Sequence, residues 1–228
     1  MNAIFYFSGT GNSRYAAQTL AHQTGDALYD MTRVRTASHA SLRYERIGWV
    51  FPVYAWGIPL WVKRFIQSLP PDFASSQSYV YGVLTCGDDV GLTHRELQAL
   101  LRSKDMELDA VFSLQMPNTY VSLPGFDVDS EDLIRKKLQY ATPSLRHIAS
   151  AVIRQERGIN HVHTGSFPRL KSRFLRPLFN RFLLTDRYFH VLPTCNGCRA
   201  CSAHCPINNI RHDADGKPLW TGRCTGCL

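Results

Sequence analysis

Six cysteines gather near the end of the chain at spacings that could hold a metal centre: Cys195, Cys198, Cys201, Cys205, Cys224 and Cys227. The first three follow a Cys-x2-Cys-x2-Cys pattern, which can wrap one face of a cubane iron–sulfur cluster. The fourth is followed by Pro206 and points away, so it can ligate a second cluster. Zinc held by the two Cys-x2-Cys pairs is the alternative, but it leaves the third and fourth cysteines without a role.

A small polar loop near the start of the chain could bind an anion; it consists of Ser8, Gly9, Thr10, Gly11, Asn12 and Ser13. Between a strand and a helix, such a loop lets several backbone N–H groups converge on one anion, and the helix dipole adds to the attraction. No lysine follows as in GxxxxGK[ST], and Arg14 stands where GxGxxG has its last glycine. The neutral loop therefore suits a terminal monophosphate. A glycine-rich turn whose serine or asparagine caps the helix is the alternative.

Two later loops have the residue types that a flat ring system requires. The first consists of Pro52, Val53, Tyr54, Ala55, Trp56 and Gly57, and the second of Thr85, Cys86 and Gly87. Tyr54 and Trp56 offer ring faces for stacking, while Gly57 and Gly87 let backbone amides approach a ring edge. Ordinary packing at a strand end is the alternative for the two aromatic residues. Cys86 fits a small buried side chain, and we assign it no redox role.

Strands and helices alternate along the first two thirds of the chain and would position these loops. Short apolar runs predict strands over 3–7, 27–29, 47–52, 79–84 and 110–114, and helical spacing predicts helices over 12–21, 58–69, 92–101 and 131–154. Pro143 is expected to kink or split the last helix. The alternation predicts an α/β fold with a doubly wound, five-stranded parallel sheet covered on both faces. Ligands of such sheets bind outside the carboxyl ends of the strands, where the loops lie.

The segment from Phe7 to Ser13 resembles the FMN phosphate loop of the flavodoxin-like family. The resemblance extends to residues 51–59, 85–89 and 116–120, which follow the strands where that family holds its flavin. It implies a flavodoxin-like FMN-binding domain over residues 1–157, with FMN at the carboxyl edge of the sheet. Residues 158–190 are expected to form a basic connector with one or two short helices and no readable chemistry.

The cysteine-rich tail is similar to the bacterial two-cluster ferredoxins, and the whole chain resembles the flavodoxin–ferredoxin fusion family, the EFR-type ferredoxins. By that resemblance the first three cysteines hold one [4Fe–4S] cluster, and Cys205, Cys224 and Cys227 belong to a second. The family pattern continues with further cysteines, whereas this sequence stops at Leu228. Residues 191–228 are therefore expected to be a small α+β ferredoxin-like domain, incomplete at its C-terminus. Labile clusters or a nonprotein ligand are the alternatives.

The composition limits the classes of partner and the compartment. The formal net charge of +8 comes almost wholly from residues 131–190, which hold 12 Lys and Arg against 4 Asp and Glu. No nucleic-acid-binding motif accompanies this charge, so the basic segment is expected to lie against anionic cofactors or an acidic electron carrier. No signal peptide pattern and no apolar run long enough for a membrane helix is visible. Clustered cysteines without a disulfide framework are typical of a reducing cytoplasm.

The two resemblances together imply an electron-transfer oxidoreductase. Electrons would pass between the 4Fe–4S clusters and FMN, which couples one-electron and two-electron partners. The partner would be a redox protein, such as a ferredoxin or a flavoenzyme, or a small-molecule electron acceptor. The alternative is a flavin-dependent reductase that acts directly on a small molecule such as a quinone or a nitro compound. Whether the protein is an enzyme or a carrier stays open at the level of the sequence.

Overall fold

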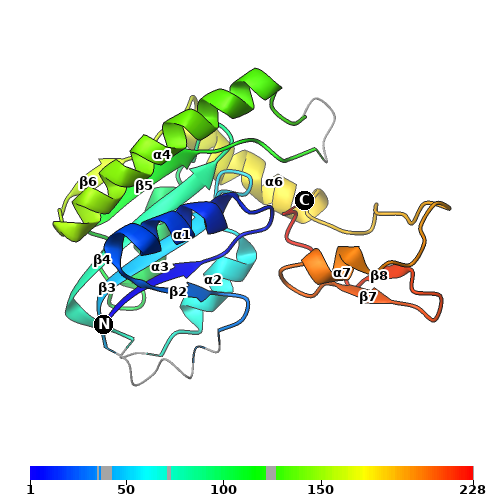
Figure 1. Ribbon diagram of the computed structural model, residues 1–228, viewed down its shortest axis with the longest axis horizontal. Coiled ribbons are helices and arrows are strands. Elements are labelled where there is room, and N and C mark those ends of the chain that lie inside the picture. The colour runs from blue at the N-terminus through cyan, green and yellow to red at the C-terminus, as the bar shows by residue number, and fades with distance from the viewer. Residues whose placement is uncertain (35, 37–42, 71–72, 122–126, 228) are drawn as a thin grey trace.

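The computed structural model describes residues 1–34, 36, 43–70, 73–121 and 127–227. Strands and helices alternate in the first two thirds of the chain, as the sequence predicts (Figure 1). In chain order these elements are β1 (Asn2–Tyr6), α1 (Asn12–Thr24), β2 (Ala27–Asp30), β3 (Tyr44–Pro52), α2 (Leu60–Gln67), β4 (Ala74–Cys86), α3 (Thr93–Arg102), β5 (Ala110–Gln115) and α4 (Glu131–Ile153).

The main sheet is parallel throughout, with the strand order β2-β1-β3-β4-β5-β6. Its first five strands have the order 2-1-3-4-5, which is that of flavodoxin-like doubly wound sheets. The α/β fold class predicted from the sequence is confirmed. The carboxyl ends of β1, β3, β4 and β5 meet at one edge, so the loops that follow them lie together there.

The prediction of five strands is wrong by one. A sixth strand, β6 (Ile159–His161), pairs with β5 from Ala110 to Phe112, in a region that the sequence assigns to the connector. The strand has only three residues, includes a polar asparagine and a histidine, and lies at the edge of the sheet, where two of its side chains are exposed. A short polar edge strand lacks the apolar run from which buried strands are recognised.

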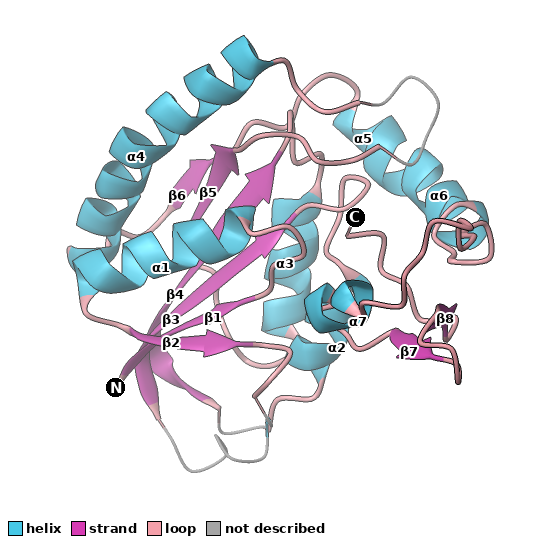
Figure 2. Ribbon diagram, turned by 45° about the vertical axis from the view of Figure 1, so that its right-hand side comes forward, coloured by secondary structure: helices cyan, strands magenta, loops and turns pink. Residues whose placement is uncertain are grey.

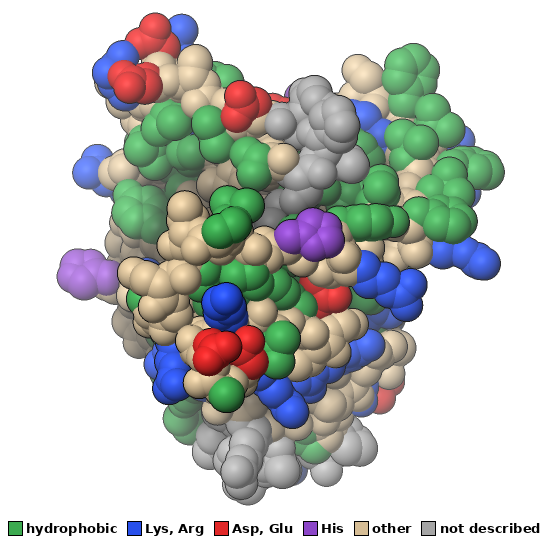
Figure 3. Space-filling view, turned by 90° about the vertical axis from the view of Figure 1, so that its right-hand side faces the viewer, with side chains coloured by type: hydrophobic (Ala, Val, Ile, Leu, Met, Phe, Trp, Pro, Cys, Tyr) green, Lys and Arg blue, Asp and Glu red, His purple; other side chains and the backbone are tan. Residues whose placement is uncertain are grey.

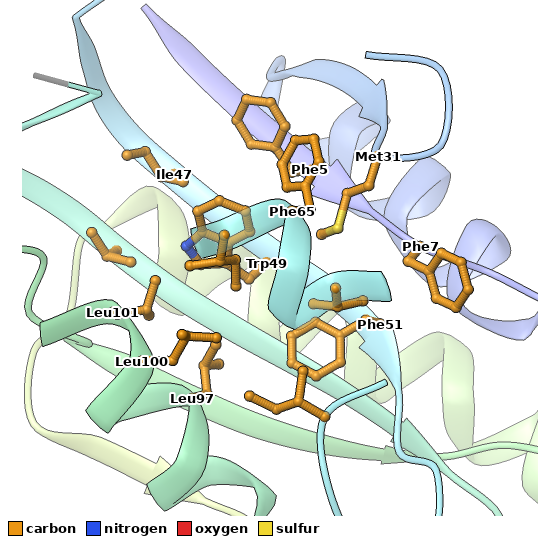
Figure 4. Close-up of a cluster of buried hydrophobic side chains, with 14 of the residues drawn as sticks. Phe5, Phe7, Met31, Ile47, Trp49, Phe51, Phe65, Leu97, Leu100 and Leu101 are labelled. Carbon is orange, nitrogen blue, oxygen red and sulfur yellow. The ribbon is translucent and has the colours of Figure 1, made fainter. Parts of the chain in front are cut away.

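Helices cover both faces of the sheet because alternate strand residues point to opposite sides. Ile4 and Val50 pack into the core beneath α1 and α4, while Phe5, Trp49 and Phe51 pack into the core beneath α2 and α3. In the second core the rings of Phe5, Trp49 and Phe65 point toward one another (Figure 4). These two apolar layers fix the sheet and therefore the positions of the loops at its edge.

Helix α4 runs unbroken from Glu131 to Ile153, so the expectation that Pro143 could split it is wrong. Buried residues on both sides of the proline, among them Ala141 and Leu145, hold the helix against the sheet. Packing therefore outweighs the hydrogen bond that a proline removes from a helix interior.

Ser130 caps the first turn of α4, and its removal gives a modest, measurable effect. Its Oγ accepts the backbone N–H of Leu133 at 3.4 Å. We expect Ser130→Ala to lower the free energy of unfolding by about 1 kcal/mol, because one N–H of the first turn loses its partner. Urea unfolding measures the change, with exposed Ser150→Ala on the same helix as control. Equal stability of the two variants would contradict the capping role.

The rest of the chain forms a helical segment and a small cysteine-containing module. The helical segment comprises α5 (Pro168–Leu170), the π-helical η2 (Lys171–Leu175) and α6 (Arg176–Phe182). The module contains α7 (Ala200–His204) and an antiparallel pair, β7 (Ile210–His212) and β8 (Pro218–Trp220). Its small α+β content agrees with the predicted composition of this region, while its ferredoxin-like nature stays a prediction. No helix in the described part of the chain is long and apolar enough to cross a membrane.

Candidate functional site

A cavity of about 630 Å³ opens at the carboxyl ends of β1, β3, β4 and β5. Its volume is in the range of sites for cofactors and other small ligands. All of the predicted flavin-site residues line it except Gly11 and Gly57. The remaining wall residues are Asp88, Asp89, Pro117, Asn118, Thr119, Tyr120, Lys171, Leu175, Leu178, Phe179, Phe182, Leu183, Thr225, Gly226 and Cys227.

The loop after β1 begins α1 and is tied to its neighbours by side chains. Ser8 Oγ accepts the N–H of Gly11 at 3.1 Å, and the Asn12 amide donates to the Pro117 carbonyl at 2.9 Å. Gly11 itself precedes α1 with φ 106°, a conformation that favours glycine, and does not line the cavity. These bonds tie the loop to its neighbours where it enters the first turn of α1, the end of a helix that attracts an anion.

The six residues of this loop therefore have different roles. The Ser13 hydroxyl is buried and shares a 2.7 Å hydrogen bond with Thr85, so it supports the loop from below. The Thr10 hydroxyl lies 3.3 Å from that of Thr119 at the exposed rim. In the structure the Ser13 hydroxyl is hydrogen-bonded to that of Thr85. The sequence could not indicate this pair, because the two residues are 72 positions apart.

The loop after β3 contains a tight turn with unusual backbone angles. Tyr54 and Gly57 exchange two backbone hydrogen bonds of 3.1 Å, and the residues between them, Ala55 and Trp56, have φ of 44° and 57°. Left-handed angles at two non-glycine residues cost free energy and are found preferentially at ligand-binding sites. The turn directs the Tyr54, Ala55 and Trp56 side of the loop into the cavity wall.

Gly57 does not approach the cavity as the sequence interpretation suggested. Its N–H donates to the Tyr54 carbonyl, and a Cβ built on it would lie 1.8 Å from the Arg176 guanidinium carbon. The glycine is therefore needed so that Arg176 can pass close to the turn. Trp56 has the ammonium group of Lys171 over its ring, 5.5 Å from the ring centroid. This cation–π contact joins the loop after β3 to the helical segment.

The loop after β4 places Cys86 and Gly87 at the cavity floor. A Cβ built on Gly87 would lie 3.2 Å from the Asn118 side chain, so the glycine permits a close approach between the loops after β4 and β5. Cys86 is only 6% exposed, and burial, followed by the charges of Asp89 and Asp88, raises the pKa of its thiol to about 12. The thiol is therefore neutral near pH 7, as expected of a small packing residue.

This pKa predicts that Cys86 resists alkylation. At pH 8 its thiolate fraction should be about a thousandfold below that of a cysteine with the ordinary pKa of 9.0. We expect iodoacetamide to label Cys86 in urea and to leave it unlabelled in the folded protein, as measured by peptide mass spectrometry. Equal labelling rates of Cys86 in the two states would contradict its buried, protonated state.

The helical segment supplies a wall of the cavity that sequence reasoning missed. Lys171, Leu175, Leu178 and Phe182 recur at helical spacing on the side that faces the cavity, and Phe179 contacts the ring of Tyr120 at a centroid distance of 6.0 Å. Residues 158–190 are expected to form a connector without readable chemistry; the structure places part of this connector in the cavity wall. The spacing of these residues was the signal available in the sequence, but one proline and three arginines between them obscured it.

Arg176 and Ser172 fasten this segment to the sheet domain. Arg176 forms an ion pair with Glu96 and donates to the Ile58 carbonyl at 2.8 Å. Ser172 donates its hydroxyl to the Trp56 carbonyl at 3.0 Å and accepts the N–H of Leu92 at 2.8 Å. Lys171 adds an ion pair with Asp89 at 2.6 Å. Two cations of the basic segment are therefore already neutralised by the sheet domain.

The cysteine-containing tail closes the third side of the cavity. A Cβ built on Gly9 would lie 2.4 Å from Cys227 Cβ and 2.8 Å from Tyr54 Oη, so the tail packs directly on the loop after β1. Burial raises the pKa of Tyr54 well above 10, and nearby Cys227 and Cys224 raise it further. Figure 2 shows the C-terminal segment returning to the edge of the sheet.

The six clustered cysteines form two groups in space. Cys195, Cys198 and Cys201 all line a second cavity, of about 490 Å³, within the small module. In the other group, burial raises the pKa of Cys227 to about 11, with further increases from Cys224 and Cys205. Among the described residues, no three His, Cys, Asp or Glu side chains come close enough together to hold one metal ion.

Backbone N–H groups already point at two sulfurs of the second group. Asn209 N–H donates to Cys205 Sγ at 3.2 Å, and Gly226 N–H donates to Cys224 Sγ at 3.3 Å. Such bonds stabilise a thiolate, and hydrogen bonds to cluster sulfurs are one of the ways in which proteins tune iron–sulfur centres. The cysteine sulfurs and the N–H groups that donate to them are therefore of the chemical type that binds a metal centre. In the described residues, however, the sulfurs do not surround a common point.

No protein-family model and no curated protein matches this chain. Similar solved structures include a flavodoxin from Streptococcus pneumoniae TIGR4, at 16% identity and a TM-score of 0.41, covering 62% of this chain and 94% of the other. The Trp repressor binding protein from Bacillus subtilis has 15% identity and a TM-score of 0.45, covering 68% and 96%. An FMN-dependent NADH-azoreductase from Bacillus anthracis has 8% identity and a TM-score of 0.43, covering 65% and 100%.

Proposed function

We propose that the chain transfers electrons between iron–sulfur centres held by its six clustered cysteines and an FMN bound at the edge of the sheet. When bound, iron–sulfur clusters exchange single electrons and FMN exchanges one or two, so together they couple one-electron and two-electron partners. A reducing compartment such as the cytoplasm would keep the thiols available for ligation. The protein's own residues would hold these groups, bring them close together and exclude water between them.

The residues of the first cavity fit FMN. The loop after β1 carries no acidic side chain and leads into the N-terminus of α1, so its N–H groups and the hydroxyls of Ser8 and Thr10 would bind the phosphate. Tyr54 and Trp56 would flank the ring system, and Gly87 leaves space for its edge. Tyr54 is protonated at neutral pH, as any tyrosine with a pKa of 10 or above is, so its hydroxyl can donate a hydrogen bond.

The single observation that carries the proposal is the contact between Cys227 and Gly9. This contact puts a proposed cluster ligand against the proposed phosphate loop of the flavin, and Thr225 and Gly226 share the cavity wall with it. The probability of electron tunnelling falls steeply with distance, so two redox groups that share a wall are suited to exchange electrons.

Anaerobic purification with chemical analysis tests the proposal. We expect the chain to retain FMN together with iron and acid-labile sulfide, and Cys224→Ser to lose iron while it retains FMN. Cys86→Ser serves as the matched control for iron content, which it should retain because Cys86 belongs to neither cysteine group; its FMN content is not compared, since Cys86 lines the proposed flavin cavity. A chain that binds zinc but no iron, or that binds no flavin, would contradict the proposal.

A second candidate function, a reductase of small apolar molecules such as quinones or nitro compounds, is favoured by the wall of the helical segment. Leu178, Phe179 and Phe182 present apolar surface to the same cavity, opposite the proposed flavin loops. Steady-state turnover of a soluble quinone by the FMN-loaded chain tests this candidate. Turnover that falls at least about tenfold in Phe182→Ser, with FMN affinity unchanged, would favour a reductase. No quinone turnover would favour a carrier.

A further inference from the structure

The outer face of the helical segment carries exposed cations beside exposed apolar side chains. The residues of this outer face are Phe167, Arg169, Leu170, Arg173, Phe174 and Arg181. None of them lines the first cavity, whose wall takes the opposite residues of the same segment. In Figure 3 green apolar side chains lie beside blue Lys and Arg side chains at the upper right, where α5 and α6 lie. The outer face is therefore distinct from the proposed flavin site.

The charge of this region has one sign. The sequence contains no Asp or Glu between Arg157 and Asp186, while it contains five Lys or Arg from 169 to 181. Lys171 and Arg176 point inward and pair with Asp89 and Glu96, so they are not available to a partner. Arg169, Arg173 and Arg181 are exposed on the outer face and form a cationic surface.

The apolar side chains of the outer face are exposed to an unusual degree. Phe167 is 76% exposed, Phe174 65% and Leu170 50%. Large apolar side chains that stand together in water mark surfaces that meet a protein or a membrane. On the outer face these apolar side chains alternate with arginines along the helical segment, so they can enter the acyl boundary of a lipid bilayer while the cations bind headgroups.

We propose that the outer face of the helical segment binds the surface of a membrane that contains anionic lipids. The three arginines supply the charge complementary to lipid phosphates, and Phe167, Leu170 and Phe174 supply the apolar contact. Membrane binding goes beyond the proposed electron transfer and does not depend on it.

Two features favour a lipid surface over an acidic protein or a second copy of the chain. Phe167 and Phe174 are exposed beside the arginines, and a fluid acyl layer can surround such side chains without offering a matching pocket. A second copy would place this one-signed cationic face against itself, and like charges would repel. An acidic protein would pair with the arginines and leave the exposed phenylalanines without contact unless it carried matching pockets.

Vesicle co-sedimentation with the full chain tests the proposal. The probes are vesicles of phosphatidylcholine alone and vesicles in which about a third of the lipid is phosphatidylglycerol, at low and physiological salt. We expect binding to the anionic vesicles to exceed binding to the neutral ones by at least about tenfold. Arg169→Glu with Arg173→Glu should reduce anionic binding by at least about tenfold, and so should Leu170→Ser with Phe174→Ser.

The control variant makes the same charge change elsewhere. Lys136→Glu with Arg146→Glu replaces two exposed cations of α4, and we expect it to lower binding by less than about threefold. Near-ultraviolet circular dichroism verifies that each variant is folded.

Equal binding to neutral and anionic vesicles, or equal losses in the two charge-reversed variants, would overturn the proposal. So would dimerisation through this face, or binding to polyglutamate beads but not to anionic vesicles. FMN content is measured separately, so the failure of the flavin proposal can be distinguished from the failure of membrane binding.

Discussion

Gly9→Ala is expected to separate the cysteine-containing tail from the loop after β1. The new methyl group would lie 2.4 Å from Cys227 Cβ and 2.8 Å from Tyr54 Oη, so the tail must move away. Overpacking of this kind costs about 1–3 kcal/mol. We expect the free energy of unfolding to fall by that amount, the FMN affinity to fall, and the amides of Thr225 to Cys227 to exchange hydrogen faster, as measured by mass spectrometry.

Two further variants attribute the effect of Gly9→Ala to this contact. Thr10→Ser adds no atom, keeps the hydroxyl at the rim of the same loop and should leave all three quantities nearly unchanged. Adding Cys227→Gly to Gly9→Ala removes the atom that the methyl group meets and should restore part of the lost stability, which gives a coupling energy. If Gly9→Ala changes stability without faster exchange in the tail, the packing of the tail on this loop is contradicted.

Arg176→Ala is expected to release the helical segment from the sheet domain and so to open the cavity. The substitution removes the ion pair with Glu96 and the hydrogen bond to the Ile58 carbonyl. Hydrogen bonds to a charged group contribute about 1.5–3 kcal/mol, and Arg176 makes two such contacts while mostly buried. We expect FMN affinity to fall at least about tenfold, as measured by fluorescence titration, because the wall formed by α6 is lost.

Arg173→Ala is the matched control for Arg176→Ala, because it removes the same side chain from the exposed face of the same helical segment. Limited proteolysis should cut residues 157–190 faster in Arg176→Ala than in Arg173→Ala. Equal cutting rates and equal FMN affinities of the two variants would show that Arg176 does not hold the wall of the cavity.

The sheet and its loops could be predicted from the sequence because their causes are local. Apolar runs such as Ala3–Phe7 and residues 79–84 are short, uniform and followed by loops, so they indicate buried parallel strands. Once the strands are placed, the loops after β1, β3 and β4 must meet at one edge. Because these loops meet at one edge, most of the predicted flavin-site residues line one cavity.

The remaining features depend on contacts between distant segments. Cys227 packs on Gly9, and Arg176 packs on Gly57, yet neither glycine differs in the sequence from one that merely permits a turn. Strand β6 is recognisable only by its pairing with β5. Pro143 shows the opposite case, in which a local rule predicts a break and burial of the surrounding helix prevents it. In all four cases tertiary packing, and not the local sequence, determines the structure.

The structure also changes the interpretation of the basic charge. The sequence analysis places the excess in residues 131–190 and expects it to lie against anionic cofactors or an acidic electron carrier, whereas the cations of residues 169–181 lie on two faces of the helical segment. Lys171 and Arg176 pair with Asp89 and Glu96 and build the cavity wall. Arg169 and Arg173 remain on the outside, beside exposed Phe174. Part of the charge therefore holds the cavity wall, and the other part forms the outer face that we propose for membrane binding.

The central claim is that electrons pass between the cysteine-containing module and a flavin in the adjoining cavity. Stopped-flow absorbance of the anaerobically purified, FMN-loaded chain, mixed with a reduced ferredoxin-type carrier, tests it most directly. We predict that FMN is reduced at least about tenfold faster in the unmodified chain than in Cys224→Ser, with equal FMN content. Equal rates of FMN reduction in the two proteins would contradict the claim.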